Sequence, residues 1–197
     1  MANTFAPFGF SQYAGNGSAP TYEQVERQIA TTAGAIYSGD PVTSQSDGTI
    51  AQSAPGTTQI AGIFLGCEYL SAAIGRTVWS SYWPGSGSAV SGSTVKAYIV
   101  NDPNAKFVCQ SGNAGSAVTL ANVGNNINFA IGTGNTLTGR SGAYANQATI
   151  NTTATLPFRI VDLITTPPGA NGTDTASNGN WIVVAFNNVD TKSLTGI

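Results

Sequence analysis

The stretch Ile60-Ala-Gly-Ile-Phe-Leu-Gly-Cys-Glu-Tyr69 decides the fold class of this chain. It is apolar almost throughout, and turn-forming segments bound it, with Pro55-Gly56 before it and residues 72–75 after it. A short apolar run between turn signals is typical of a strand that is buried on both faces. The sequence therefore predicts a central, buried strand at this position.

Shorter apolar runs beside turn formers recur along the rest of the chain. We interpret as strands the runs 42–46, 77–79, 94–100, 106–110, 158–164 and 181–186, and as turns Ser38-Gly39-Asp40-Pro41, Asp47-Gly48 and Asn101-Asp102-Pro103-Asn104. In the segment 22–31, the spacing of the apolar residues fits a short helix and an edge strand equally well. Short strands at this spacing predict an all-β fold, a single sandwich or jelly-roll-like barrel, over residues 21–197.

Residues 1–20 are predicted to form an extended N-terminal arm. Its aromatic residues Phe5, Phe8, Phe10 and Tyr13 alternate with glycine and proline, which prevent a regular helix. The rings can be buried either on a neighbouring subunit or on the arm's own domain. Ordering the arm costs about 1–2 kcal/mol per residue, while burying one aromatic side chain contributes about 1.5–3 kcal/mol. We therefore expect the arm to become ordered only on a partner, so that deletion of residues 2–19 leaves the melting temperature nearly unchanged.

The composition leaves little material for catalysis. The chain has no histidine and only 8% charged residues, which excludes Ser-His-Asp and Cys-His nucleophile systems and His-rich metal sites. Basic residues are scattered singly in a chain of formal charge −2, so we expect no nucleic-acid partner. We also expect no signal peptide, no membrane contact and no cofactor, because the chain lacks long apolar segments and phosphate-binding glycine motifs. The sequence indicates a protein that is not an enzyme.

Few polar residues remain as candidates for a chemical site. Glu68 and Asp162 lie on predicted strands and offer the two carboxylates that a glycosidase needs, which is the least favoured interpretation. Oxygen ligands for calcium are available in the turn 101–104 and around Asp174, but without the spacing of a calcium loop. Aspartates in turns usually cap backbone amides. No catalytic, cofactor-binding or metal-binding residue is therefore predicted.

Cys67 and Cys109 are the only two thiols of the chain, and both lie among apolar neighbours on predicted strands. Cysteine in such surroundings is usually buried and free. We therefore predict two buried free thiols. A disulfide would require the two strands to be neighbours.

Trp79, Tyr82 and Trp83 form an aromatic cluster that ends at a Pro-Gly turn. Aromatic faces suit the apolar faces of pyranose rings, so the cluster fits a sugar-stacking platform. It also fits core packing or a subunit contact, since interface cores are enriched in Trp and Tyr, and we favour these two. The residues predicted to bind a partner are Phe5, Phe8, Phe10, Tyr13, Trp79, Tyr82 and Trp83.

Several segments carry a family resemblance when they are taken together. They are Met1-Ala-Asn-Thr with Pro7 and Gly9-Phe10, Tyr37-Ser-Gly-Asp-Pro-Val42, the stretch 60–69, Ser81-Tyr-Trp-Pro84, and 95–110 with its Asp102-Pro103-Asn104 turn. In these features the chain resembles the capsid decoration, or cement, proteins of tailed bacteriophages. The likeness covers roughly residues 1–110, and none of its motifs carries chemistry.

The resemblance implies a structural virion protein. Such a protein, made in the host cytoplasm, binds the outer surface of an icosahedral shell and clamps neighbouring subunits of the major capsid protein. Because three capsomers meet at three-fold and quasi-three-fold junctions, we expect a homo-oligomer, with a trimer preferred to a dimer. The alternative function is a tail-fibre or receptor-binding β domain that binds surface glycan through the aromatic cluster around Trp83.

Overall fold

Antiparallel strands make up almost all of the regular structure in the computed structural model of this chain, which describes residues 2–14 and 24–192. Within those residues there is no α-helix, only one 3-10 turn, so the all-β prediction is confirmed. In chain order the elements are β1 (Ser11–Ala14), β2 (Gln24–Gln28), β3 (Ile36–Tyr37), β4 (Pro41–Ser44), β5 (Ile50–Gln52), β6 (Gly62–Leu70), β7 (Thr77–Ser80), β8 (Tyr82–Trp83), β9 (Lys96–Val100), β10 (Lys106–Gln110), η1 (Leu120–Asn122), β11 (Asn126–Ala130), β12 (Tyr144–Asn151), β13 (Phe158–Leu163) and β14 (Trp181–Phe186).

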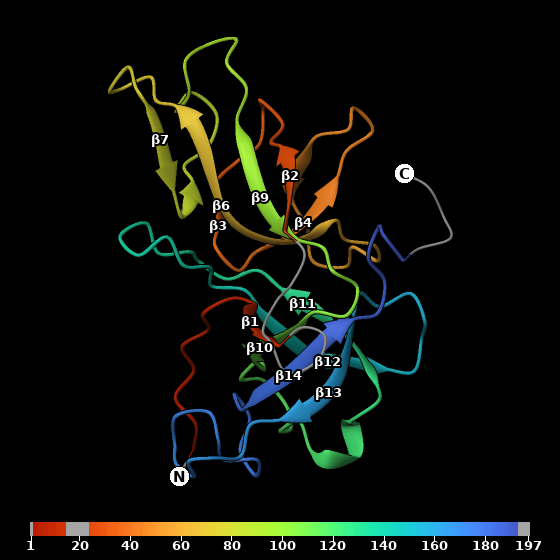
Figure 1. Ribbon diagram of the computed structural model, residues 1–197. Coiled ribbons are helices and arrows are strands. Elements are labelled where there is room, and N and C mark those ends of the chain that lie inside the picture. The colour runs from red at the N-terminus through yellow and green to blue at the C-terminus, as the bar shows by residue number, and fades with distance from the viewer. Residues whose placement is uncertain (1, 15–23, 193–197) are drawn as a thin grey trace.

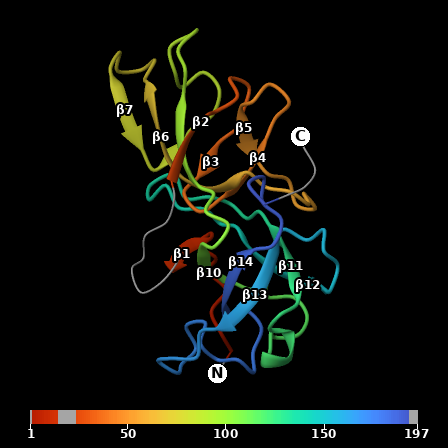
Figure 2. The ribbon, with the colours of Figure 1, turned by 45° about the vertical axis from the view of Figure 1, so that its right-hand side comes forward.

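The strands form two larger sheets, which lie one above the other in Figures 1 and 2. Sheet A has the order β1-β10-β14-β13-β11-β12, and sheet B has the order β2-β9-β6-β4-β5, with β7 also paired to β6. The short strands β3 and β8 pair with each other. Sheet A is strongly curled, so that β12, at one end of its strand order, approaches β10 near the other end. The amide of Gly112, just beyond β10, donates to the carbonyl of Ala145 on β12 at 2.9 Å. This arrangement is consistent with the predicted β-sandwich.

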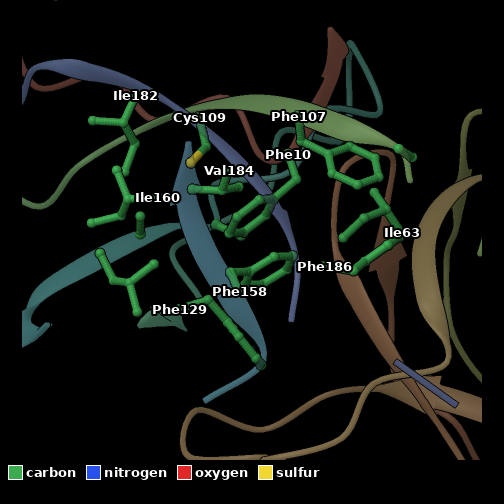
Figure 3. Close-up of a cluster of buried hydrophobic side chains, with 14 of the residues drawn as sticks. Phe10, Ile63, Phe107, Cys109, Phe129, Phe158, Ile160, Ile182, Val184 and Phe186 are labelled. Carbon is green, nitrogen blue, oxygen red and sulfur yellow. The ribbon is translucent and has the colours of Figure 1, made fainter. Parts of the chain in front are cut away.

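The central strand lies between two hydrophobic clusters, one under each sheet. Ile60 and Ile63 belong to the cluster of sheet A, whereas Ala61 and Phe64 belong to the cluster of sheet B. Each of the four side chains is 2% exposed or less. In Figure 3, Ile63 reaches from its strand into the cluster of sheet A. The prediction that this stretch is buried on both faces is confirmed for residues 60–64, whereas Leu65 and Glu68 further along the strand are only half-buried.

Two local predictions have clear outcomes. The segment that fits both a helix and an edge strand contains β2, which pairs antiparallel with β9 and ends the strand order of sheet B. Residues 22 and 23 of that segment lie outside the described residues. The Asp47-Gly48 turn joins β4 to β5 as expected, and Gly48 has a φ of 82°, a left-handed conformation that glycine adopts without steric cost.

The described part of the N-terminal arm is folded onto its own domain. Phe10 is 1% exposed and stacks on Phe158, with 4.5 Å between the ring centroids. Figure 3 shows it inside the cluster of sheet A. Phe5 and Phe8 make edge-to-face contacts at 5.3 and 5.5 Å with Tyr144 and Trp181, respectively. Residues 15–20 of the predicted arm lie outside the described residues.

Polar contacts hold the same segment along its backbone. The buried side chain of Gln110 accepts from the amide of Ala6 at 2.8 Å and donates to the carbonyl of Thr4 at 2.7 Å. The side chain of Asn3 donates to the carbonyl of Asp174 at 2.8 Å. For residues 2–14, the expectation that the arm becomes ordered only on a partner is therefore wrong. Its entropic cost is offset within the monomer by a core aromatic ring and by hydrogen bonds that the sequence alone does not reveal.

The turn between β3 and β4 joins the arm to both sheets. The carbonyl of Gly39 accepts from the amide of Phe10 at 2.9 Å, and its amide donates to the carbonyl of Phe64 at 2.8 Å. Ser38 exchanges backbone hydrogen bonds with the loop before β12, through Gly139 and Ser141. Gly39 has a φ of 97°, which favours glycine at this position. The turn predicted from the sequence is thus also the junction of the fold.

A buried carboxylate lies at this junction. Asp40 is 1% exposed, and its side chain accepts hydrogen bonds from the hydroxyl of Ser141, the amide of Tyr37 and the amide group of Gln52. Burial disfavours the charged form and raises the pKa of Asp40 above its ordinary value of 3.8, although the three hydrogen bonds act in the opposite direction. The carboxylate connects β3, β5 and the loop before β12.

Replacing Phe10 by alanine should destabilise the isolated protein by about 3–5 kcal/mol, because the change leaves a cavity in the core. Urea unfolding followed by circular dichroism measures this loss. Tyr13→Ala is the matched control, because that side chain is 55% exposed and should change the unfolding free energy by less than about 0.5 kcal/mol. Equal unfolding free energies of the Phe10→Ala variant and the wild type would contradict the packing of the arm on its own domain.

The raised pKa of Asp40 predicts a stability that falls with rising pH. The folded state binds the Asp40 proton more tightly than the unfolded chain does, so this contribution is present below pH 3.8 and is lost as the pH rises through the folded-state pKa. Asp40→Asn removes the titration. Its unfolding free energy relative to the wild type should therefore increase as the pH is raised from about 4 towards 7. Urea unfolding at several pH values measures the difference, and a constant difference would contradict the assignment.

Candidate functional site

The seven residues predicted to bind a partner differ widely in exposure. Phe10 and Trp83 are each 1% exposed, so they lie in the core and are inaccessible to a partner of the folded protein. Their assignment to a partner surface is corrected. Phe5, Phe8 and Tyr82 are half-buried. The two that face solvent are Tyr13 and Trp79, with exposures of 55% and 64%.

The tryptophan and tyrosine cluster does not form one surface. Trp83 packs edge-to-face on Tyr69 at 5.1 Å, and its indole N–H donates to the carbonyl of Ala33 at 3.4 Å. Tyr82 stacks on Tyr37, with ring centroids 5.3 Å apart. Only Trp79 points outward, because β7 pairs with β6 whereas β8 pairs with β3, so the chain changes partner strand between them. Neighbours in sequence thus reach different environments.

Tyr13 lies at a groove on the outer side of sheet A, next to β1. The groove has a volume of about 440 Å³ and is lined by Phe8, Ser11, Tyr13, Val108, Arg140, Ile164 and Trp181. Within the described residues, β1 pairs with β10 alone. Sequence reasoning placed two of the lining residues, Phe8 and Tyr13, in a partner surface. It missed Trp181 and Arg140, which come from distant segments, and the only local signal was an aromatic residue at the start of a predicted strand.

The loop that supplies Arg140 also presents an apolar side chain. Leu137 is 96% exposed. The side-chain oxygen of Asn135 accepts from the amides of Leu137 and Thr138 at 2.9 and 3.1 Å, and the amide of Asn135 donates to the carbonyl of Arg140 at 2.8 Å. These bonds hold the loop in one conformation. Leu137 is therefore displayed on an internally hydrogen-bonded turn, three residues before Arg140 in the sequence.

The two carboxylates considered for hydrolysis lie in different sheets. Glu68 is on β6 of sheet B, and its Oε2 atom accepts from the hydroxyl of Tyr98 at 3.1 Å. Asp162 is on β13 of sheet A, and its Oδ1 atom accepts from the amide of Leu163 at 2.8 Å. Each carboxylate has a local partner, and the structure does not bring them together.

The oxygen-rich turns considered for calcium use their side chains locally. Asp102 accepts from the amide of Asn104 at 2.8 Å. Asp174 accepts from the amide of Ala176 at 3.0 Å and from the hydroxyl of Ser177 at 2.9 Å. In residues 2–14 and 24–192 there is no group of three or more His, Cys, Asp or Glu side chains placed to hold a metal ion.

Both cysteines are buried and free, as predicted from the sequence. Cys67 lies on β6 and Cys109 on β10, in different sheets, so their strands are not neighbours. Burial raises the pKa of Cys67 to about 12 and that of Cys109 further still. At neutral pH both are therefore thiols and not nucleophilic thiolates.

Comparisons with known proteins identified no relative. A scan against protein-family models, a search of curated proteins and a search of solved structures each found no match. In the described part of the chain, no helix has the length and apolarity to cross a membrane. The candidate site is accordingly defined by its own geometry: the aromatic groove beside β1, with Arg140 at its edge and Leu137 on the adjoining loop.

Proposed function

We propose that the protein is a structural virion component that binds the outer surface of a tailed-phage capsid and clamps neighbouring subunits of the major capsid protein. The observation that carries this proposal is the groove beside β1. It combines two partly buried aromatic residues, Phe8 and Trp181, with the exposed Tyr13 and with Arg140. Tyr, Trp and Arg are the residue types enriched where protein interfaces gain most of their free energy. The family resemblance of residues 1–110 supplies the identity of the partner.

The aromatic side chains of the groove are preordered for a protein contact. Phe8 is held by its edge-to-face contact with Trp181, so the two rings are already ordered before a partner arrives. A preordered aromatic surface loses little side-chain entropy on binding. Leu137 adds an exposed apolar group whose burial contributes about 1.5–3 kcal/mol. Together these features favour a contact that is apolar at its centre and charged only at Arg140.

Binding to the assembled shell stabilises that shell by mass action and needs no catalysis. A protein that binds only the assembled state stabilises it by about 2.7 kcal/mol per site when its free concentration is a hundred times the dissociation constant. Repetition of the same site over an icosahedral particle multiplies this stabilisation. An inert, turn-rich β fold with buried thiols suits a component that is exposed outside the cell.

Decoration should depend on Tyr13. Tyr13→Ser removes an exposed ring from the groove, and we expect at least a tenfold weaker association with expanded shells of the major capsid protein, equivalent to about 1.4 kcal/mol. Co-sedimentation of the purified protein with such shells measures this change. Leu120→Ser is the matched control, because Leu120 is exposed but lies on η1 and does not line the groove. Equal binding by both variants, or no binding by the wild type, would refute the proposal.

Self-association into a trimer is the second part of the proposal. A trimer contacts three capsomers at once, and rigid linkage of three weak sites raises avidity by roughly 10²–10⁴ where the geometry permits. Sedimentation equilibrium at micromolar concentration should give three times the chain mass of 20.0 kDa. A dimer would change the expected capsid position. A strictly monomeric mass would restrict any contact between copies to the capsid surface.

A further inference from the structure

Trp79 is a large aromatic side chain that the fold lays on the outer face of sheet B. It is 64% exposed, and it lies against Gly66 of the neighbouring strand β6. A Cβ atom at Gly66 would come within 2.8 Å of Cζ2 of the indole ring, so the absence of a side chain at Gly66 lets the ring approach the sheet. The ring is thereby supported from the sheet side while much of its surface remains in solvent.

Strand register places a row of polar side chains next to this ring. Glu68 pairs with Trp79 across β6 and β7, Lys96 pairs with Glu68 across β6 and β9, and Gln28 pairs with Lys96 across β9 and β2. Paired residues in a sheet point to the same face. An indole ring, a carboxylate, an ammonium group and a carboxamide therefore follow one another across four strands, over about 14 Å at the usual spacing of 4.8 Å.

A second row, Gly66, Tyr98 and Glu26, runs beside the first across β6, β9 and β2, and its side chains bond to those of the first row. Tyr98 pairs with Gly66, and its hydroxyl donates to Oε2 of Glu68 at 3.1 Å. In the described residues Oε1 of Glu68 accepts no hydrogen bond. Glu26, on β2, accepts from Lys96 in an ion pair of 3.2 Å. The hydroxyl of Tyr98 thus orients the carboxylate of Glu68, and the ion pair with Glu26 positions the ammonium group of Lys96, which pairs with Glu68 across the strands.

The face is also hollowed along this row. One hollow, of about 350 Å³, is lined by Glu68, Leu70, Thr77, Ser93, Thr94 and Lys96. A second, of about 270 Å³, shares Thr94 and Lys96 with it and extends to Glu26, Arg27 and Gln28. Hydroxyl groups, the carboxylates of Glu68 and Glu26 and the ammonium group of Lys96 therefore line two adjoining hollows, and Trp79 lies outside their lining.

The charges of this face indicate which class of ligand fits. The charged residues that line the two hollows are Glu26, Arg27, Glu68 and Lys96, which sum to a formal charge of zero, and the ammonium group is already paired with Glu26. A face without net charge has no net electrostatic attraction for phosphate, sulfate and uronate groups. Hydroxyl groups, in contrast, donate to the carboxylate and accept from the ammonium and carboxamide groups. The negative face of the indole ring attracts the C–H groups of a sugar ring, which carry a small positive charge.

We infer that the outer face of sheet B binds an uncharged glycan, with one pyranose ring stacked on Trp79 and the hydroxyl groups of the next sugar bonded to Glu68 and Lys96. This activity goes beyond capsid decoration and uses a different sheet from the groove beside β1. The proposed site differs from the glycan site considered from the sequence, which was centred on Trp83, because Trp83 is buried and takes no part. A capsid-bound copy would carry a glycan-binding surface on the virion.

Calorimetric titration of the full chain with neutral oligosaccharides of glucose, galactose, mannose and N-acetylglucosamine tests the inference. At least one series should bind, and sulfated and uronate-containing oligosaccharides should not. Trp79→Ser should weaken binding at least tenfold. Ile74→Ser is the matched control, because Ile74 lies in the turn between β6 and β7 and is 65% exposed, and it should bind as the wild type does. Glu68→Gln should weaken binding by a smaller factor.

A measurement on the wild-type protein removes any dependence on the folding of a variant. The indole N–H resonance of Trp79 should shift on titration with the bound sugar, while those of Trp83 and Trp181 stay in place. Binding of charged sugars only, no binding of any neutral series, or an unmoved Trp79 resonance would overturn the inference. Both Trp79→Ser and Ile74→Ser should still decorate shells, so a failure of capsid binding and a failure of glycan binding are separately visible.

Discussion

Two-sided burial of residues 60–64 is the constraint on which the rest of this structure depends. Alternate side chains of one extended segment enter two different hydrophobic clusters, so the segment cannot shift by one residue without exchanging the contents of both. Ile99 and Val100 on the neighbouring β9 divide in the same way. The positions of both sheets are therefore set from a single strand pair, and the remaining strands add to either side of it.

The turn that contains Asp40 connects this central strand to the N-terminal segment. Its glycine bonds to Phe64 on the central strand and to Phe10 on the arm, and its buried carboxylate binds Gln52 and Ser141. A buried charge is costly unless it is hydrogen-bonded, and here the bonds come from segments far apart in the sequence. The arm thus becomes part of the core, and the loop that carries Leu137 is held beside it.

The two surfaces proposed for binding result from what the cores leave outside. Tyr13 and Trp79 both lie on edge strands, β1 and β7, and more than half of each side chain is exposed to solvent. The groove beside β1 is mainly apolar and suits a protein, whereas the outer face of sheet B combines one ring with paired charges and suits hydroxyl groups. The two proposed sites therefore lie on separate sheets and differ in their chemistry.

The sequence by itself determined the fold class, the central strand, the Asp47-Gly48 hairpin and the buried thiols, because periodicity, turn chemistry and cysteine burial are local properties. It did not determine the fate of the aromatic residues. Phe10 and Trp83 are buried while Tyr13 and Trp79 are exposed, although all four lie in similar aromatic segments. Only the tertiary structure decided this, because the exposure of a ring depends on strand register and on the residues it packs against. Phe10 packs on Phe158, which is distant in the sequence, and Trp79 lies on Gly66, which nothing in the local sequence identifies as its contact.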